Sequence, residues 1–245
     1  MHELIELLKS DMKPALGVTE PGAIAFAVST ACSYLSGEVE SIELRLNSGI
    51  YKNAFTCGIP SSPHLGNLYA AALGAIAADN SKGLECLSSV TPADNKAAEK
   101  MIADGRITVL LSEVSSRIHI EVVARCGNES AEVIIWDSHT NITCIKHNGE
   151  IVEGSDSPAY DQSEPAEPPI IHKYTLQDFV NLVNEVSFDD IAFIKDAYTV
   201  NLHLYDVAMA SDRTTFAKLL YKNNGNKTIS DNAVDTASLL SNAAI

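Results

Sequence analysis

The apolar positions of the first 80 residues alternate between helical and strand spacing. From Pro21 to Leu35 apolar residues recur three and four positions apart, and Gly37 follows where a helix would end. Residues 41–46 alternate polar and apolar side chains, which is typical of a half-buried strand. Residues 66–78 are mostly alanine and glycine, which predicts a buried helix that its neighbours approach closely.

Between residues 92 and 149 the pattern predicts one more helix and then several strands. The helix extends from Pro92 to Asp104, and Gly105 ends it. Four strands are expected at residues 107–111, 117–125, 131–136 and 141–146. Asn148 and Gly149 are typical of a hairpin turn, because both residue types tolerate positive φ. Strands that follow one another so closely favour an antiparallel sheet.

The remaining residues differ from this α+β part. Residues 153–169 are acidic, contain four prolines and lack an apolar period, which indicates a linker or an exposed loop. Helical spacing returns at residue 170, with Thr175 and Ser187 as candidate caps. The predicted fold class is therefore α+β: an antiparallel sheet with packed helices, followed by a helical C-terminal region.

The expected organisation follows from these boundaries. Residues 1–152 form an α+β domain with a pocket, residues 153–169 a linker or loop, and residues 170–245 a helical region. An apolar run from Val234 to Ile245 closes the sequence without a polar cap. We expect a second polypeptide, or a further part of the same one, to cover that run.

Composition narrows the class of protein. The 245 residues carry a formal net charge of −15, which argues against nucleic acid or an anionic membrane as a partner. Hydrophobic residues make up 46% and charged residues 20%, a balance that favours a packed core over a disordered chain. The sequence has no long uninterrupted apolar stretch and no basic start typical of a signal peptide, so a cytoplasmic protein is expected.

Cysteine spacing gives no support for a metal site within this chain. The five cysteines are Cys32, Cys57, Cys86, Cys126 and Cys144. None of them forms the closely spaced pairs that zinc and iron–sulfur sites use, so they are expected to pack as reduced thiols.

Thr19 and Glu20 are the first candidates for chemistry. They precede Pro21 at a predicted helix start, where backbone N–H groups favour an anion. An ordinary helix cap explains the same residues.

Lys52 and Asn53 form the second candidate pair, in a region rich in Gly, Ser and Pro between a strand and the small-residue helix. Lys52 is suited to a substrate carboxylate, although a solvated surface lysine fits equally well.

The third candidate is the segment from Asp137 to Asn141, which includes His139 and Thr140. His139 titrates near neutral pH and is suited to moving protons. A turn that satisfies its own backbone is the alternative. Phosphate-loop, dinucleotide-binding, serine-hydrolase and zinc-protease motifs are absent from the sequence.

Three segments in this order resemble the N-terminal half of the L-cysteine desulfidase family, also described as serine dehydratase alpha-like. The segments are KPALGVTEPGAIAFA, NSGIYKNAFTCGIP with LGNLYAAALGAIA after it, and SHTNITCIKHNGEIV. The resemblance extends from Asp11 to the C-terminus and includes NLVNEVSFDDIAFIKDA.

This resemblance implies β-elimination from a small amino acid such as L-cysteine or L-serine, which yields an oxoacid and ammonia. It also implies a [4Fe-4S] cluster that acts as a Lewis acid on the leaving group. The expected catalytic residues are Glu20 and His139. The residues expected to bind the substrate are Thr19, Lys52, Asn53, Thr140 and Asn141.

Two departures from the family pattern change this expectation. Val18 occupies the position of a family cysteine, and the cluster-binding cysteines belong to a second half that these 245 residues do not include. We therefore expect a substrate-binding subunit or half of an iron–sulfur lyase. Its cluster ligands are expected outside this chain, on a second subunit or on a missing part of a truncated polypeptide. The alternative is a non-catalytic small-molecule-binding or regulatory relative.

Overall fold

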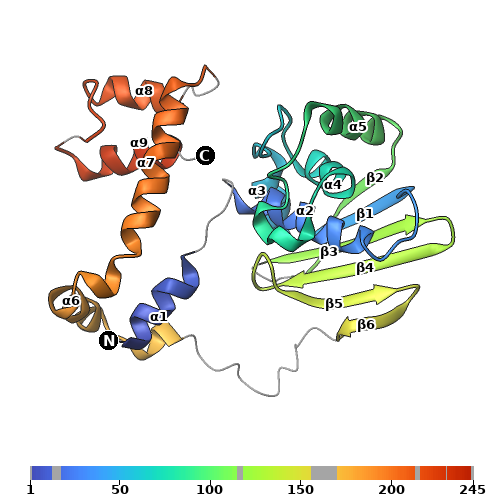
Figure 1. The fold of residues 1–245 in the computed structure, drawn as a ribbon, viewed down its shortest axis with the longest axis horizontal. Coiled ribbons are helices and arrows are strands. Elements are labelled where there is room, and N and C mark those ends of the chain that lie inside the picture. The colour runs from blue at the N-terminus through green and yellow to red at the C-terminus, as the bar shows by residue number, and fades with distance from the viewer. Residues whose placement is uncertain are drawn as a thin grey trace. The chain divides into compact units, whose positions relative to one another are not determined.

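The computed structural model describes residues 2–12, 18–114, 118–155, 170–212, 216–229 and 231–243. The chain divides into two compact units (Figure 1). One unit consists of Ala15–Asp161, and the other combines Met1–Pro14 with Gln162–Ile245. Helix α1 (His2–Asp11) therefore groups with the C-terminal helices, whereas the sequence analysis placed it in the α+β domain.

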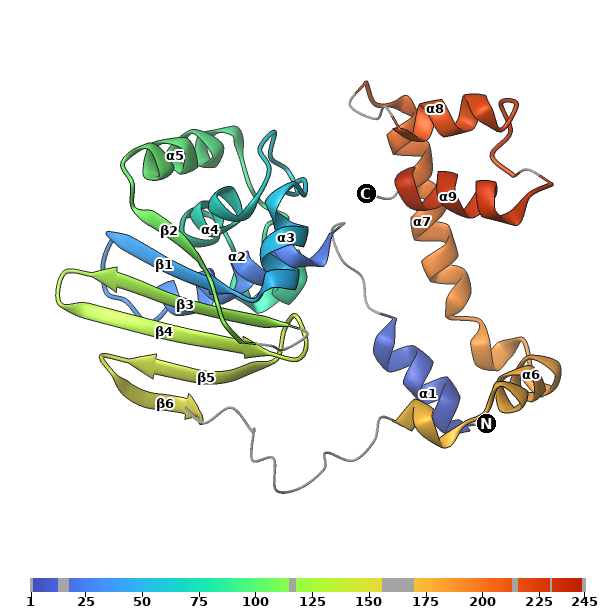
Figure 2. The ribbon, with the colours of Figure 1, turned by 180° about the vertical axis from the view of Figure 1, so that it is seen from behind.

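A six-stranded sheet with the strand order β2-β1-β3-β4-β5-β6 forms the base of the α+β unit. Its strands are β1 (Ser41–Leu46), β2 (Ile107–Leu111), β3 (His119–Cys126), β4 (Glu129–Trp136), β5 (Ile142–His147) and β6 (Glu150–Gly154). Neighbouring strands are antiparallel except β1 and β2, which are parallel. The helices of this unit gather on one face of the sheet (Figure 2). The predicted fold class is confirmed.

The helices on that face are α2 (Thr19–Cys32), α3 (Ser48–Phe55), α4 (Asn67–Ile76), the short η1 (Asn80–Glu85) and α5 (Pro92–Ala103). The helices expected from Pro21, from residue 66 and from Pro92 are all present. Helix α3 was not expected. Its sequence is poor in strong helix formers, but Ile50 and Ala54 are four positions apart and buried, so tertiary packing favours the helix.

Close contact between α2 and α4 builds the centre of the core. A side chain at Gly74 would place its Cβ only 2.9 Å from the Cα of Ala25, so the two backbones nearly touch. The inner sheet residues Ile42, Leu44 and Ile120 are completely or almost completely buried beneath the helices. The buried small-residue helix is therefore confirmed.

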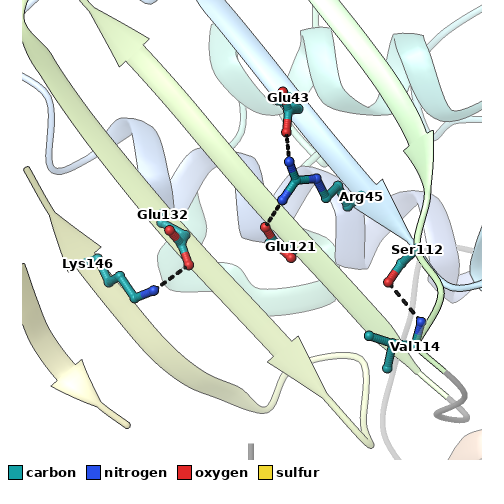
Figure 3. A network of polar contacts seen from close by, with 7 residues as sticks. All are labelled: Glu43, Arg45, Ser112, Val114, Glu121, Glu132 and Lys146. Carbon is teal, nitrogen blue, oxygen red and sulfur yellow. Dashed lines mark hydrogen bonds and ion pairs between the residues drawn. The ribbon is translucent and has the colours of Figure 1, made fainter. Parts of the chain in front are cut away.

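The opposite face of the sheet carries ion pairs (Figure 3). Arg45 contacts Glu43 and donates to Glu121 at 2.8 Å, and Lys146 donates to Glu132 at 2.9 Å. These side chains border a shallow hollow of about 430 Å³.

The helical unit contains α1 and the elements that follow residue 170. These are η2 (Ile170–Lys173), α6 (Leu176–Glu185), η3 (Asp189–Ile191), α7 (Ile194–Ala210), α8 (Phe216–Asn223) and α9 (Ala233–Ala243). Leu4 and Ile5 of α1 pack against Leu182 of α6 in one cluster, and Tyr205 and Leu239 belong to a second.

The predicted cap of α6 is confirmed, because the Thr175 hydroxyl and the Asp178 carboxylate form a capping box. Most of the predicted linker, from residue 156 to 169, lies outside the described residues, as do Ala244 and Ile245 of the C-terminal apolar run. Within the described ranges, none of the helices combines the length and apolar character that crossing a membrane requires.

Candidate functional site at the start of α2

Three elements that are distant in sequence meet at the start of α2. Thr19 lies in the first turn of α2, and its Oγ1 is 3.3 Å from Nε2 of His139 in the β4–β5 turn, 120 positions later. Pairing of β4 with β5 closes this turn, and Asp137 adopts positive φ within it. The fold therefore brings the first and third sequence candidates together.

Glu20 is held from two sides. The side-chain amide of Asn53 in α3 donates to Oε1 of Glu20 at 2.9 Å. The hydroxyl of Thr19 donates to Oε2 at 3.4 Å. Both carboxylate oxygens therefore have a hydrogen-bond donor, and the carboxylate orientation is set by α2 and α3 together.

An ordinary side-chain cap does not explain Thr19 and Glu20. The residue at the N-cap position is Val18, which has no side-chain oxygen and makes no capping hydrogen bond. Thr19 and Glu20 occupy the first helical turn, where a carboxylate interacts favourably with the helix dipole. Their side chains are therefore available for contacts outside the helix.

His139 is suited to act as a neutral base. Burial lowers the pKa of its imidazole, and the nearby Glu20 carboxylate opposes this effect in part. A lowered pKa keeps the ring uncharged near neutral pH. One ring nitrogen then carries a lone pair that can accept a proton.

Cys57 is a neighbour that the sequence analysis interpreted only as a packing residue. Its thiol donates to the backbone oxygen of Asn53 at 2.6 Å. Burial raises the pKa of the thiol, and the charge of Glu20 raises it further. No local signal in the sequence indicates this position, because a cysteine that packs has the same pattern.

The other predicted site residues are not joined to this network by hydrogen bonds. Lys52 is exposed and has no hydrogen-bond or ion-pair partner among the described residues. The side-chain amide of Asn141 donates to the backbone oxygen of Trp136 at 2.9 Å and closes the turn. Thr140 is exposed and points its methyl group toward Gly83 of η1.

The described residues hold no group of three His, Cys, Asp or Glu side chains that could bind a metal ion. Ligands of the expected [4Fe-4S] cluster were predicted to lie outside this chain, so the cluster stays a prediction.

The chain is similar to bacterial proteins named UPF0597. It is 32% identical to that of Dichelobacter nodosus over 244 residues, which cover 99% of this chain and 56% of the relative. It is 35% identical to that of Kosmotoga olearia over 233 residues, which cover 93% of this chain and 54% of the relative. The chain thus spans about half the length of the curated relatives it matches. No family model and no solved structure matches it.

This similarity corrects the family resemblance stated above. The relatives carry the name UPF0597, so the assignment to the L-cysteine desulfidase family was wrong. The prediction that the resemblance is limited to an N-terminal half was wrong as well, because the similarity to the Dichelobacter nodosus protein extends over 99% of this chain. The first two quoted segments are rich in Gly, Pro and Ala, which are required by turns and close helix packing in many folds and say little about a particular family.

Proposed function

We propose that this chain provides the amino-acid-binding and proton-transfer site of a lyase that eliminates the β-substituent of a small amino acid, such as L-cysteine or L-serine. The main support is the link from the Glu20 carboxylate through the Thr19 hydroxyl to the His139 imidazole. A fixed carboxylate suits an ammonium group, and a neutral imidazole suits removal of a proton.

Binding of the substrate uses opposite charges on its two ends. The ammonium group lies against Glu20, whose orientation is fixed by Asn53. The substrate carboxylate lies toward the first turn of α2, because that turn has no side-chain cap and favours an anion. Lys52 on the adjacent helix α3 supplies a second positive charge for the same carboxylate.

Chemistry then begins at the α-carbon. His139 accepts the α-proton, and the electron pair of the Cα–H bond forms the Cα=Cβ bond. The bond from Cβ to the leaving group breaks, and the group leaves with its electron pair as hydrosulfide or hydroxide. It is protonated by solvent, to which the His139 imidazolium returns the α-proton. The enamine tautomerises to an imine, which water converts to an oxoacid and ammonia.

We also propose that a second subunit supplies the ligands of a [4Fe-4S] cluster, which would act as a Lewis acid on the leaving group.

The test combines binding and turnover. The protein is purified anaerobically, both alone and co-expressed with the reading frame next to its gene, and titrated calorimetrically with L-cysteine, L-serine and glycine. Ammonia release is then measured for each preparation. Glu20→Gln is expected to weaken binding about tenfold, and His139→Gln to reduce ammonia release about a hundredfold with little change in affinity.

His203→Gln is the matched control, because His203 is an exposed histidine of α7 in the helical unit. It is expected to leave affinity and turnover unchanged. If neither preparation binds an amino acid, the proposal fails. Binding without ammonia release in both preparations would instead support the non-catalytic binding protein.

A further inference from the structure

The hydrogen bonds of Thr19 restrict where the proton of His139 resides. A threonine hydroxyl has one hydrogen to donate, and an ionised carboxylate can only accept. Oγ1 of Thr19 lies 3.4 Å from Oε2 of Glu20 and 3.3 Å from Nε2 of His139. The carboxylate is the stronger acceptor of the two because it is charged, so it takes the hydroxyl hydrogen.

With the hydroxyl hydrogen directed to Glu20, Oγ1 presents only lone pairs to the imidazole. Nε2 must then be the donor, since two lone pairs facing each other would repel. In a neutral imidazole only one nitrogen carries hydrogen, so Nδ1 has the lone pair. Thr19 is the only hydrogen-bond partner of His139 among the described residues, which leaves Nδ1 without a competing protein donor there.

We propose that Thr19 is a positioning residue that holds the proton of His139 on Nε2, and that Nδ1 is the atom that accepts a proton from a ligand. The role given to Nδ1 rests on the proposed function, whereas the position of the proton does not.

The chain of bonds also suits the state after proton transfer. When Nδ1 accepts a proton, the ring becomes an imidazolium and Nε2 continues to donate to Thr19. The Thr19 hydroxyl continues to donate to Glu20, so no group needs to turn. Asn53 contributes by holding the other oxygen of Glu20, which keeps Oε2 directed at Thr19.

The tautomer of His139 can be read by nitrogen-15 NMR on the full chain labelled at histidine. Spectra are recorded at about pH 8, above the ordinary histidine pKa near 6.5, and His139→Gln identifies the signal. The wild type and Thr19→Ser are expected to show predominantly the Nε2–H form. Thr19→Val, which keeps the shape but lacks the hydroxyl, is expected to increase the Nδ1–H share several-fold.

Thr140→Val is the matched control, because Thr140 adjoins His139 in the turn but makes no hydrogen bond to it. It should retain the wild-type tautomer. Backbone amide spectra of each variant establish that it is folded. An Nδ1–H form in the wild type, or an unchanged tautomer in folded Thr19→Val, would overturn the proposal.

Amino-acid binding and ammonia release by the same proteins separate this inference from the proposed function. The expected tautomer together with absence of amino-acid binding would sustain the role of Thr19 and reject the lyase site. Turnover together with an Nδ1–H ring would support the lyase site and reject the role of Thr19. If both hold, Thr19→Val should lower kcat about tenfold while KM stays nearly constant, because geometry is lost and not affinity.

Discussion

Asn53 donates its side-chain amide to Oε1 of Glu20 at 2.9 Å, across 33 positions of sequence. The contact joins α3 to the first turn of α2. It gives α3 a part in the site, because the helix places the amide where it fixes one oxygen of the carboxylate. Asn53 is therefore placed to orient Glu20.

Replacement of Asn53 by Ala is expected to weaken amino-acid binding about tenfold. A hydrogen bond to a charged group contributes about 1.5–3 kcal/mol, and solvent exposure of this pair reduces that value toward the lower end. Calorimetric titration measures the change. Asn181→Ala, an exposed asparagine of α6, is the control and should bind like the wild type. Unchanged affinity in Asn53→Ala would contradict the role of this amide.

The free energy of unfolding is expected to fall as the pH drops below about 6.5, the ordinary histidine pKa. Burial lowers the pKa of both His119 and His139 in the folded protein. Between that lowered value and the ordinary one, the unfolded chain binds more protons than the folded chain, so acid favours unfolding. Urea denaturation at a series of pH values measures the slope.

His119→Phe should reduce that slope and stabilise the protein by about 1 kcal/mol. His119 is only 3% exposed, packs edge-on against Trp136 and has a buried Nδ1 without a hydrogen-bond partner in the described part of the chain. Phenylalanine keeps the aromatic contact and removes the unpaired polar atom. An unaltered pH slope in this variant would show that His119 does not contribute to it.

Gly74→Ala is expected to destabilise the α+β unit by about 1–3 kcal/mol. The new Cβ would lie 2.9 Å from backbone atoms of Ala25, so α2 and α4 would have to separate. Gly58→Ala is the matched control, since a Cβ at Gly58 meets no atom within 4 Å. Thermal melting of both variants tests the contact, and equal midpoints would refute it.

The pair formed by Lys146 and Glu132 on the polar face of the sheet is expected to couple by about 0.5–1 kcal/mol (Figure 3). The two side chains are largely but not completely shielded, so added salt should weaken the coupling. A double-mutant cycle with Lys146→Met and Glu132→Gln, measured at low and high salt, tests this. A coupling independent of salt would indicate packing as its origin.

Local patterns predicted much of the fold because the start and end of a helix and the alternation of a strand depend on neighbouring residues. Proline and glycine mark the start of α5 and its end at Gly105, and alternation marks β1. Helix α3 was missed because its stability comes from burying Ile50 and Ala54, which depends on tertiary contacts. The parallel pairing of β1 with β2 was missed for a related reason, since a helix-containing connection of 60 residues separates the end of β1 at Leu46 from the start of β2 at Ile107.

In the candidate site, too, individual residues could be predicted from local sequence and their contacts could not. Thr19 and His139 were each predicted from local sequence, but they are 120 positions apart and nothing between them indicates that their side chains meet. That contact results from the sheet order, which returns β4 and β5 to the start of α2. Cys57 escaped notice because a cysteine in an apolar segment has the same pattern whether it packs or borders a site.

The grouping of α1 with the C-terminal helices has a consequence for synthesis. The carboxylate of Glu3 accepts a hydrogen bond from the hydroxyl of Tyr174, which the ribosome adds 171 residues later. Leu4 and Ile5 likewise pack against Leu182, which is synthesised long after them. During translation the α+β unit is complete before α1 has its partners, so we expect that unit to fold before α1 packs against the C-terminal helices.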